Sequence, residues 1–126
     1  MEALNVVTHF LKAYNDRNLE ALLALMHPKF TSSLYDVGTI LCKGKEEAHS
    51  IYEKRFRENP DLHISVLNRI INNEVIVDEH LIKGFDGNKT IRAISIITVT
   101  DSLIIRADFI RKQLKNNTNP SKTNKE

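Results

Sequence analysis

Cysteine is nearly absent from this sequence, since Cys42 is the only one among 126 residues. A single thiol forms no internal disulfide bond, which fits a reducing compartment. Cys42 lies in the apolar run TILC, and thiols in such surroundings are usually buried and unreactive. We therefore expect neither a disulfide-stabilised fold nor a cysteine nucleophile.

Targeting and membrane-spanning segments are not expected either. The chain begins MEALNVV, with an acidic second residue and no positively charged stretch, unlike a signal peptide. Its apolar runs are too short to cross a bilayer. These features predict a cytoplasmic protein that does not associate with membranes.

An excess of positive charge is lacking over most of the chain, although the net charge is +2. Residues 1–110 contain 13 Lys and Arg against 15 Asp and Glu, whereas residues 111–126 contain five against one. A nucleic-acid-binding domain needs a basic face on its folded part, so we expect no nucleic-acid partner. We predict one α+β domain over residues 1–112 and a disordered basic tail over residues 113–126.

Motifs that hold metals or nucleotides do not occur. The sequence has no G-x-G-x-x-G, no P-loop and no G-x-S-x-G elbow. Its five histidines include no H-x-x-x-H pair, and none is grouped with the cysteine. We therefore predict no metal site and no cofactor.

What the chain does have is a clear order of helices and strands. Apolar residues recur every three or four positions over residues 3–14, which predicts an amphipathic helix. Asn18 is expected to cap a second, short helix that ends at Pro28. Gly44 opens a third helix, and Pro60 ends it.

Strand patterns occupy most of the remaining chain. Two short strands are predicted at residues 30–35 and 39–42, followed by four longer ones at 62–71, 75–85, 90–100 and 103–112. The last four are joined by connections of two to four residues, and such short connections join antiparallel strands. The prediction is an α+β fold in which three helices pack on one face of a curved antiparallel sheet and leave a cavity.

Four stretches of the chain resemble a known family. They are YNDRNLEALLALMHPKF, CKGKEEA, VIVDEHLIKG and LIIRADF, and residues 4–111 as a whole resemble the SnoaL-like branch of the nuclear transport factor 2-like superfamily. The resemblance implies a cone-shaped, cystatin-like roll with a ligand at its open end and subunits paired through the outer sheet face. Members of this family include isomerases, cyclases, dehydratases, hydrolases and accessory domains.

The ketosteroid isomerases of that superfamily use a strand-borne aspartate base, a tyrosine and a protonated aspartate. This sequence departs from that pattern at all three places. Phe10 stands where the tyrosine should be, and Ile96 stands at the late-strand acid. The base position falls near Leu34 or Tyr35, one step from Asp36. Because an enolate then lacks its donors, we do not expect ketosteroid-type isomerisation.

Glu79 is the first candidate for chemistry. The strand at 75–85 alternates, and the face that pairs Val77 and Leu81 with Ile94 and Ile96 is apolar, so we assign it to the cavity. Glu79 shares this face, where a carboxylate is costly to desolvate and suits general acid or base catalysis. The alternative is a structural ion pair between Glu79 and Arg92.

Further candidates surround the same expected cavity. Tyr14 is expected to act with Glu79 as an orienting or oxyanion donor. The expected ligand-binding residues are Phe10, Tyr35, Tyr52, Asn68, Lys83, Arg92, Ile94, Ile96 and Phe109. Each tyrosine could equally fill the core with its hydroxyl at the rim, and Lys83 and Arg92 could equally form a solvated edge pair.

The outer sheet face is expected to form a homodimer interface. By this assignment it carries Asp78, His80, Ile82, Ser95, Ile97, Val99, Arg106, Asp108 and Ile110, a mixture that suits a two-fold contact. Two functional hypotheses stay open. One is a cofactor-free isomerase, cyclase, dehydratase or hydrolase for a small apolar or carbonyl-bearing ligand. The other is a non-catalytic ligand-binding or dimerisation module.

Overall fold

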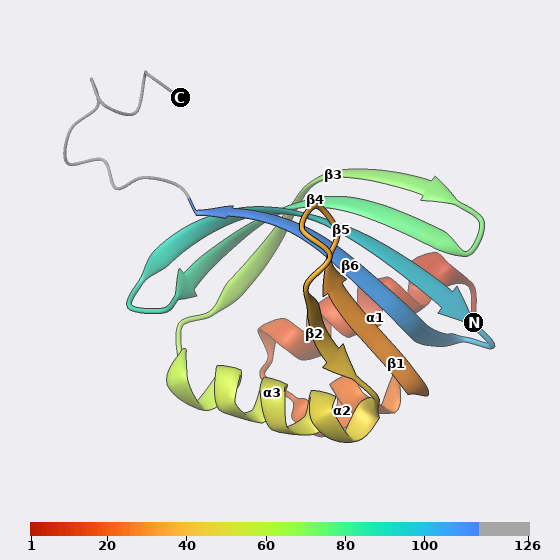
Figure 1. Cartoon of the computed structure of the whole chain (residues 1–126), viewed down its shortest axis with the longest axis horizontal. Coiled ribbons are helices and arrows are strands. Elements are labelled where there is room, and N and C mark those ends of the chain that lie inside the picture. Colours follow the sequence, from red (N-terminus) through yellow and green to blue (C-terminus); the bar gives the residue numbers. More distant parts are fainter. Residues whose placement is uncertain (114–126) are drawn as a thin grey trace.

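The computed structural model describes residues 1–113, which form three helices and one six-stranded sheet. The helices lie along one side of the sheet, which curves over them (Figure 1). In chain order the elements are α1 (Ala3–Asn15), α2 (Leu19–Ala24), β1 (Met26–Leu34), β2 (Ile40–Lys43), α3 (Lys45–Glu58), β3 (His63–Asn72), β4 (Val75–Phe85), β5 (Lys89–Thr100) and β6 (Leu103–Gln113). The α+β class predicted from the sequence is confirmed.

Local signals in the sequence place most of these elements. The side chain of Asn18 caps α2 as expected, accepting a hydrogen bond from the backbone N–H of Ala21 at 3.1 Å. However, α2 ends earlier than predicted, because Met26 already belongs to β1 and lies fully buried opposite Ile104 of β6. Of the tail predicted at 113–126, only Gln113 is described, as the last residue of β6, and the rest lies outside the described residues.

The strand order is β2-β1-β6-β5-β4-β3. All neighbouring strands are antiparallel except β1 and β6, which run parallel. The expectation of a wholly antiparallel sheet is therefore wrong at this one pair. Its physical reason is that the chain between β1 and β6 contains β2, α3 and three further strands, so no hairpin imposes an antiparallel direction.

Helix α1 packs across the sheet and forms hydrogen bonds with the edge strand β3. The side-chain amide of Asn15 donates to the carbonyl of Ile64 at 3.0 Å and accepts from its N–H at 2.8 Å. The backbone of an edge strand otherwise lacks partners on its free side. Within residues 1–113, no helix is both long and apolar enough to span a membrane.

A β-bulge in β6 decides which side chains face the helices. Thr100 pairs with Leu103 and Val99 with Ile104, but Thr98 then pairs with Arg106, so that Ile105 is the extra residue. An extra residue in one strand reverses the pairing of faces beyond it. Ala107 and Phe109 point inward and pair with Ile97 and Ser95, which therefore face inward as well.

The face assigned to the cavity from the sequence is therefore wrong. The residues of β4 and β5 that point toward the helices include Asp78, His80, Ile82, Ser95, Ile97 and Val99, all of which were expected outside. Glu79 lies on the outer face and pairs with Ile94. Both faces carry β-branched residues, so apolar character alone does not distinguish them.

Gly84 allows the end of β4 to pass close to the loop before β3. Its φ is +75°, in the left-handed region that favours glycine. A Cβ atom built there would lie 2.4 Å from the carbonyl oxygen of Asp61, which is backbone and has little freedom to move. The β4–β5 pairing is irregular at this point, between Ile82 and Phe85. No other residue type fits this position without moving the chain.

Candidate functional site

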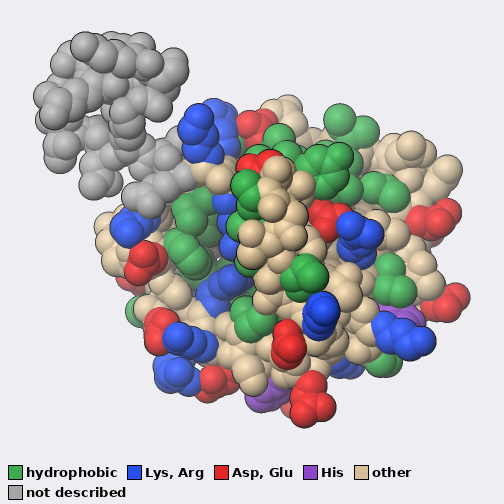
Figure 2. All heavy atoms as spheres, in the orientation of Figure 1, with side chains coloured by type: hydrophobic (Ala, Val, Ile, Leu, Met, Phe, Trp, Pro, Cys, Tyr) green, Lys and Arg blue, Asp and Glu red, His purple; other side chains and the backbone are tan. Residues whose placement is uncertain are grey.

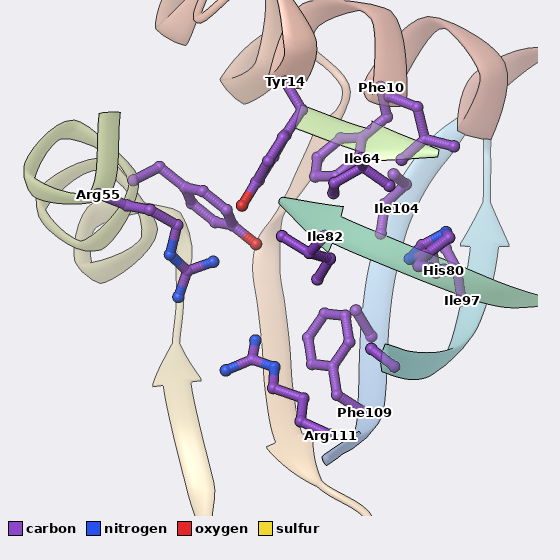
Figure 3. A pocket seen from close by; sticks show the side chains of 14 residues that line it. Phe10, Tyr14, Arg55, Ile64, His80, Ile82, Ile97, Ile104, Phe109 and Arg111 are labelled. Atoms are coloured by element: carbon purple, nitrogen blue, oxygen red, sulfur yellow. The ribbon is translucent and has the colours of Figure 1, made fainter. Parts of the chain in front are cut away.

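A cavity of about 40 Å³ lies between α1, α3 and the concave face of the sheet. Figure 3 shows its side chains converging from the helices and from β3, β4, β5 and β6. Its lining consists of Phe10, Leu11, Tyr14, Tyr52, Arg55, Ile64, His80, Ile82, Ala93, Ile97, Ile104, Ala107, Phe109 and Arg111. This volume suits about three water-sized groups, so side chains fill most of the space between helices and sheet.

A buried polar group lies beneath one side of the cavity. Asp78 is completely buried, and the guanidinium of Arg69 donates two hydrogen bonds to its carboxylate, at 2.6 and 2.8 Å. The Nε2 atom of His80 lies 3.3 Å from Oδ2 of the same carboxylate. Burial alone would raise the pKa of Asp78, but hydrogen bonds from Arg69 and His80 outweigh it and lower this pKa below its usual range.

The ionised Asp78 orients the imidazole of His80. A carboxylate beside Nε2 favours the tautomer with the proton on that nitrogen. Within residues 1–113, Nδ1 of His80 has no hydrogen-bond partner, and the imidazole lines the cavity. An unprotonated Nδ1 held in this way can accept a proton from a molecule in the cavity.

Two arginines lie on the opposite side of the cavity from His80 (Figure 3). The guanidinium of Arg55 lies 5.1 Å from the centre of the Tyr52 ring, and that of Arg111 lies 4.7 Å from the centre of the Phe109 ring. Burial, together with the nearby charge of Arg55, lowers the pKa of Arg111. Burial also lowers the pKa of Arg55, but interactions with the hydroxyl groups of Tyr14 and Tyr52 outweigh this effect and raise it.

The tyrosines add polar groups between the arginines and the apolar lining. Burial raises the pKa of the Tyr52 hydroxyl, against the influence of Arg55, so this group is a hydrogen-bond donor at neutral pH. The ring of Tyr14 meets that of Tyr52 edge to face, with centroids 6.1 Å apart. The Tyr14 hydroxyl points toward the arginine side of the cavity (Figure 3).

Arg55 also borders a wider groove on the surface. This groove of about 370 Å³ runs between the end of α3 and the β4–β5 turn, and it includes Ile51 and Phe85. Figure 2 shows basic side chains set among hydrophobic ones in the hollow between α3 and the sheet. The inner cavity and the groove share Arg55, so a ligand larger than the cavity has room to extend outward.

The structure brings together four of the site residues expected from the sequence. Phe10 and Tyr14 reach the cavity from α1, Tyr52 from α3 and Phe109 from β6. All four were expected because of helical periodicity or strand alternation relative to the apolar core. Because these patterns are local, the four predictions hold although the β-strands pair differently from what was expected.

The other expected site residues lie away from the cavity. Glu79 forms an ion pair with Arg92 at 3.0 Å and accepts a hydrogen bond from Asn68 at 2.6 Å, all on the outer face. The ion pair between Glu79 and Arg92 that was the alternative is thus formed, but on the outer face and not in the cavity. Lys83, Ile94 and Ile96 share this outer face, and Tyr35 is 63% exposed beyond the end of β1.

Sequence reasoning missed the polar residues that do face the cavity. His80 lines the cavity and Asp78 lies beneath it, and on their face of β4 they stand between Ile76 and Ile82, a pattern as apolar as the face that was chosen. Arg55 lies in the third predicted helix and Arg111 in the last predicted strand, and neither was among the expected site residues. Among residues 1–113, no three His, Cys, Asp or Glu side chains are grouped as metal ligands.

Both the sequence and the fold are similar to those of a known family. The family model of the SnoaL-like domain matches residues 7–107. The chain belongs to the SnoaL-like domain family. The predicted resemblance is thereby confirmed for most of this SnoaL-like chain, whereas no curated protein matches its sequence.

Solved structures share the fold of this SnoaL-like chain at low sequence identity. An uncharacterised cystatin-fold protein of Novosphingobium aromaticivorans has a TM-score of 0.80 at 18% identity, covering 88% of this chain and 99% of that one. A candidate ketosteroid isomerase of Kribbella flavida has a TM-score of 0.74 at 12% identity, over 89% and 78% of the two chains. IdmH, a proposed polyketide cyclase of Streptomyces antibioticus, has 0.72 at 16%, over 87% and 91%.

Proposed function

We propose that this SnoaL-like protein binds a small organic molecule in the inner cavity and transfers a proton to or from it without a cofactor. The observation that carries the proposal is the pair formed by Asp78 and His80, whose carboxylate and Nε2 lie 3.3 Å apart beside the cavity. The substrate is a carbonyl compound whose reacting end enters the cavity.

The mechanism follows from the orientation of His80. Asp78 keeps Nε2 protonated, and Nδ1 takes the proton next to the substrate carbonyl. The negative charge that develops on the carbonyl oxygen is then stabilised by a hydroxyl donor, for which Tyr14 and Tyr52 are the available groups. In a β,γ-unsaturated ketone, return of the proton from His80 to the γ-carbon gives the α,β-unsaturated isomer. Attack by the carbanion on a second carbonyl of the same molecule gives a ring, and the new alkoxide takes the proton from His80.

Names of structurally similar proteins support this class of reaction. Two of them are called a ketosteroid isomerase and a polyketide cyclase in their descriptions, and both reactions move a proton at carbon beside a carbonyl. The fold alone does not specify a reaction. The support for this chain therefore comes mainly from His80 and its surroundings.

The first experiment measures deuterium incorporation beside the carbonyl of simple ketones in D₂O by NMR. We use 4-oxopentanamide as an uncharged probe and compare wild type with His80→Gln. General-base catalysis contributes about 100-fold or more, so His80→Gln should lose most of the exchange. Glu79→Gln is the matched control, because that carboxylate lies on the other face of the same strand.

The alternative function is a non-catalytic binding module, and the small volume of the cavity favours it. Ligand pockets commonly occupy about 300–1,000 Å³, against about 40 Å³ here. If ketones shift the NMR signals of His80 without any deuterium exchange, the binding module is the correct function. If they do neither, both proposals fail.

We also propose that the outer sheet face forms a homodimer. Its apolar side chains are Ile70, Val77, Leu81, Ile94, Ile96 and Ile110, and the first of these is 66% exposed. Asp108 lies on the same face, and its Oδ1 atom is buried without a hydrogen-bond partner among residues 1–113. A second copy would cover the apolar rows and supply a donor.

A further inference from the structure

Arg55 and Arg111 differ from the other arginines of residues 1–113 in having no partner for their charge. The others form ion pairs or donate to backbone carbonyl groups: Arg57 with Glu53, Arg69 with Asp78, Arg92 with Glu79, Arg106 with Asp108, and Arg17 with the carbonyls of Asn15 and Leu62. No acid within residues 1–113 forms an ion pair with Arg55 or Arg111. Aromatic rings lie against both guanidinium groups, and the hydroxyls of Tyr14 and Tyr52 interact with Arg55, but among the described residues neither arginine faces a negative charge.

Burial and the charge of Arg55 lower the pKa of Arg111, so the arrangement is unfavourable at Arg111, whereas the tyrosine hydroxyls raise the pKa of Arg55 and favour its charge. Both guanidinium groups line a largely apolar cavity, and each is near enough to the other for the charge of Arg55 to act on Arg111. A partly buried charge without a counter-ion costs free energy, and two like charges add to that cost. Contact with the rings of Tyr52 and Phe109 offsets only part of it. Groups kept against stability are commonly kept for function.

We infer that Arg55 and Arg111 bind the carboxylate of the molecule that enters the cavity, so that the ligand is a small oxo acid. The planar guanidinium presents paired N–H donors that match a carboxylate. The hydroxyls of Tyr14 and Tyr52 lie beside Arg55 and provide further donors. The inference rests on the proposed function for the location of the ligand and for the reacting carbonyl.

Size and position favour a carboxylate over bulkier anions. The cavity of about 40 Å³ has room for three or so water-sized groups, and a carboxylate has three non-hydrogen atoms. Arg55 and Arg111 lie on one side and His80 on the other (Figure 3). A carboxylate held at the arginines therefore directs the rest of the ligand toward Nδ1 of His80.

The test compares an acid with its uncharged amide. We measure by isothermal titration calorimetry the binding of 4-oxopentanoate and of 4-oxopentanamide to the full chain. The acid is expected to bind at least about tenfold more tightly, since hydrogen bonds between charged groups are the stronger ones. This preference should disappear in Arg111→Gln and in Arg55→Gln. Arg57→Gln, two residues along the same helix and paired with Glu53 at the surface, should keep it.

Stability separates a binding role from a structural one. Without ligand, Arg111→Gln is expected to unfold at the same urea concentration as wild type or at a higher one, because it removes an unpaired charge. A lower urea midpoint together with equal loss of acid and amide binding would mean that Arg111 holds the fold, and the inference would be overturned. Tighter binding of inorganic phosphate than of 4-oxopentanoate would overturn it as well.

The outcomes also separate this inference from the proposed function. If acid and amide bind equally and both exchange deuterium, the arginines do not select a carboxylate, while His80 remains the base. If the acid binds preferentially but no deuterium is exchanged, the carboxylate site stands and the catalytic role of His80 is wrong. If neither compound binds, both are wrong.

Discussion

Asp78 and His80 stand two residues apart on β4 and share its inner face, where Oδ2 of the aspartate lies 3.3 Å from Nε2 of the histidine. Strand alternation alone brings them together, because residues i and i+2 point the same way. Arg69, opposite Asp78 on β3, completes the group with two hydrogen bonds. The imidazole of His80 is therefore oriented by the ion pair of Asp78 and Arg69, two residues on neighbouring strands of the sheet.

Asp78→Asn should destabilise the protein strongly. The substitution removes one partner of a buried ion pair and strands Arg69, whose side chain is only 22% exposed. Loss of one partner typically costs about 3–5 kcal/mol. Urea unfolding at neutral pH measures the difference. A cost below about 1 kcal/mol would show that the pair contributes little.

The same variant should also change the response to acid. Because the folded protein lowers the pKa of Asp78, this carboxylate stabilises the fold above its unfolded pKa of about 3.9, and that stabilisation is lost as the pH falls through the lower folded value. The stability difference between wild type and Asp78→Asn should be constant at pH 5 to 7 and shrink below about pH 4. A difference that persists at about pH 2 would contradict the assignment.

Glu79→Gln should change stability by less than about 1 kcal/mol, because its partner Arg92 is more than half exposed and such pairs contribute little. Ligand binding and deuterium exchange should stay at wild-type levels. The comparison with Asp78→Asn uses two adjacent acids on opposite faces of one strand. A loss of exchange in Glu79→Gln would mean that the inner face has been misassigned.

Gly84→Ala should be severely destabilising. The new methyl group would lie 2.4 Å from the carbonyl oxygen of Asp61 at a φ of +75°, so the strain of overpacking adds to the cost of a left-handed backbone. We expect a loss of at least about 3 kcal/mol in urea unfolding. Gly87→Ala is the matched control, since its φ is +78° and nothing lies within 4 Å, and it should cost about 1 kcal/mol.

Ile94→Glu should convert the proposed homodimer to monomers, because it places a charge within the apolar rows of the outer face. Sedimentation velocity measures the change. Ile40→Glu serves as the control, since Ile40 is 55% exposed on β2, away from those rows. A wild-type chain that sediments as a monomer at micromolar concentration would contradict the proposed interface.

The sequence predicts the elements well because their signals are local. Helical periodicity, the Asn18 cap, Gly44 and the short connections each act within a few residues. Which face of the last four strands turns inward depends on pairing between distant residues. The sequence around Ile105 contains no glycine or proline that would mark a bulge. The face that lines the cavity was therefore predicted from its apolar character, which both faces of β4 and β5 share.

The candidate site could be predicted only where it follows from the helices and from β6. Phe10, Tyr14 and Tyr52 belong to buried helical stripes, and these stripes meet the sheet whichever face of β5 is turned inward. His80 could be found only with the correct strand pairing. Arg111 lies two residues after Phe109 on the same face of the last strand, so strand alternation also places it inside, but its charge alone did not mark it as a site residue.

The extra residue at Ile105 also bears on how such proteins diverge. Removing one residue from β6 would restore regular pairing with β5 and turn Ile94 and Ile96, in place of Ser95 and Ile97, toward the side that Ala107 occupies. Insertion or deletion of a single codon thus replaces an interior that contains Asp78 and His80 with a more apolar one, while every other codon stays the same.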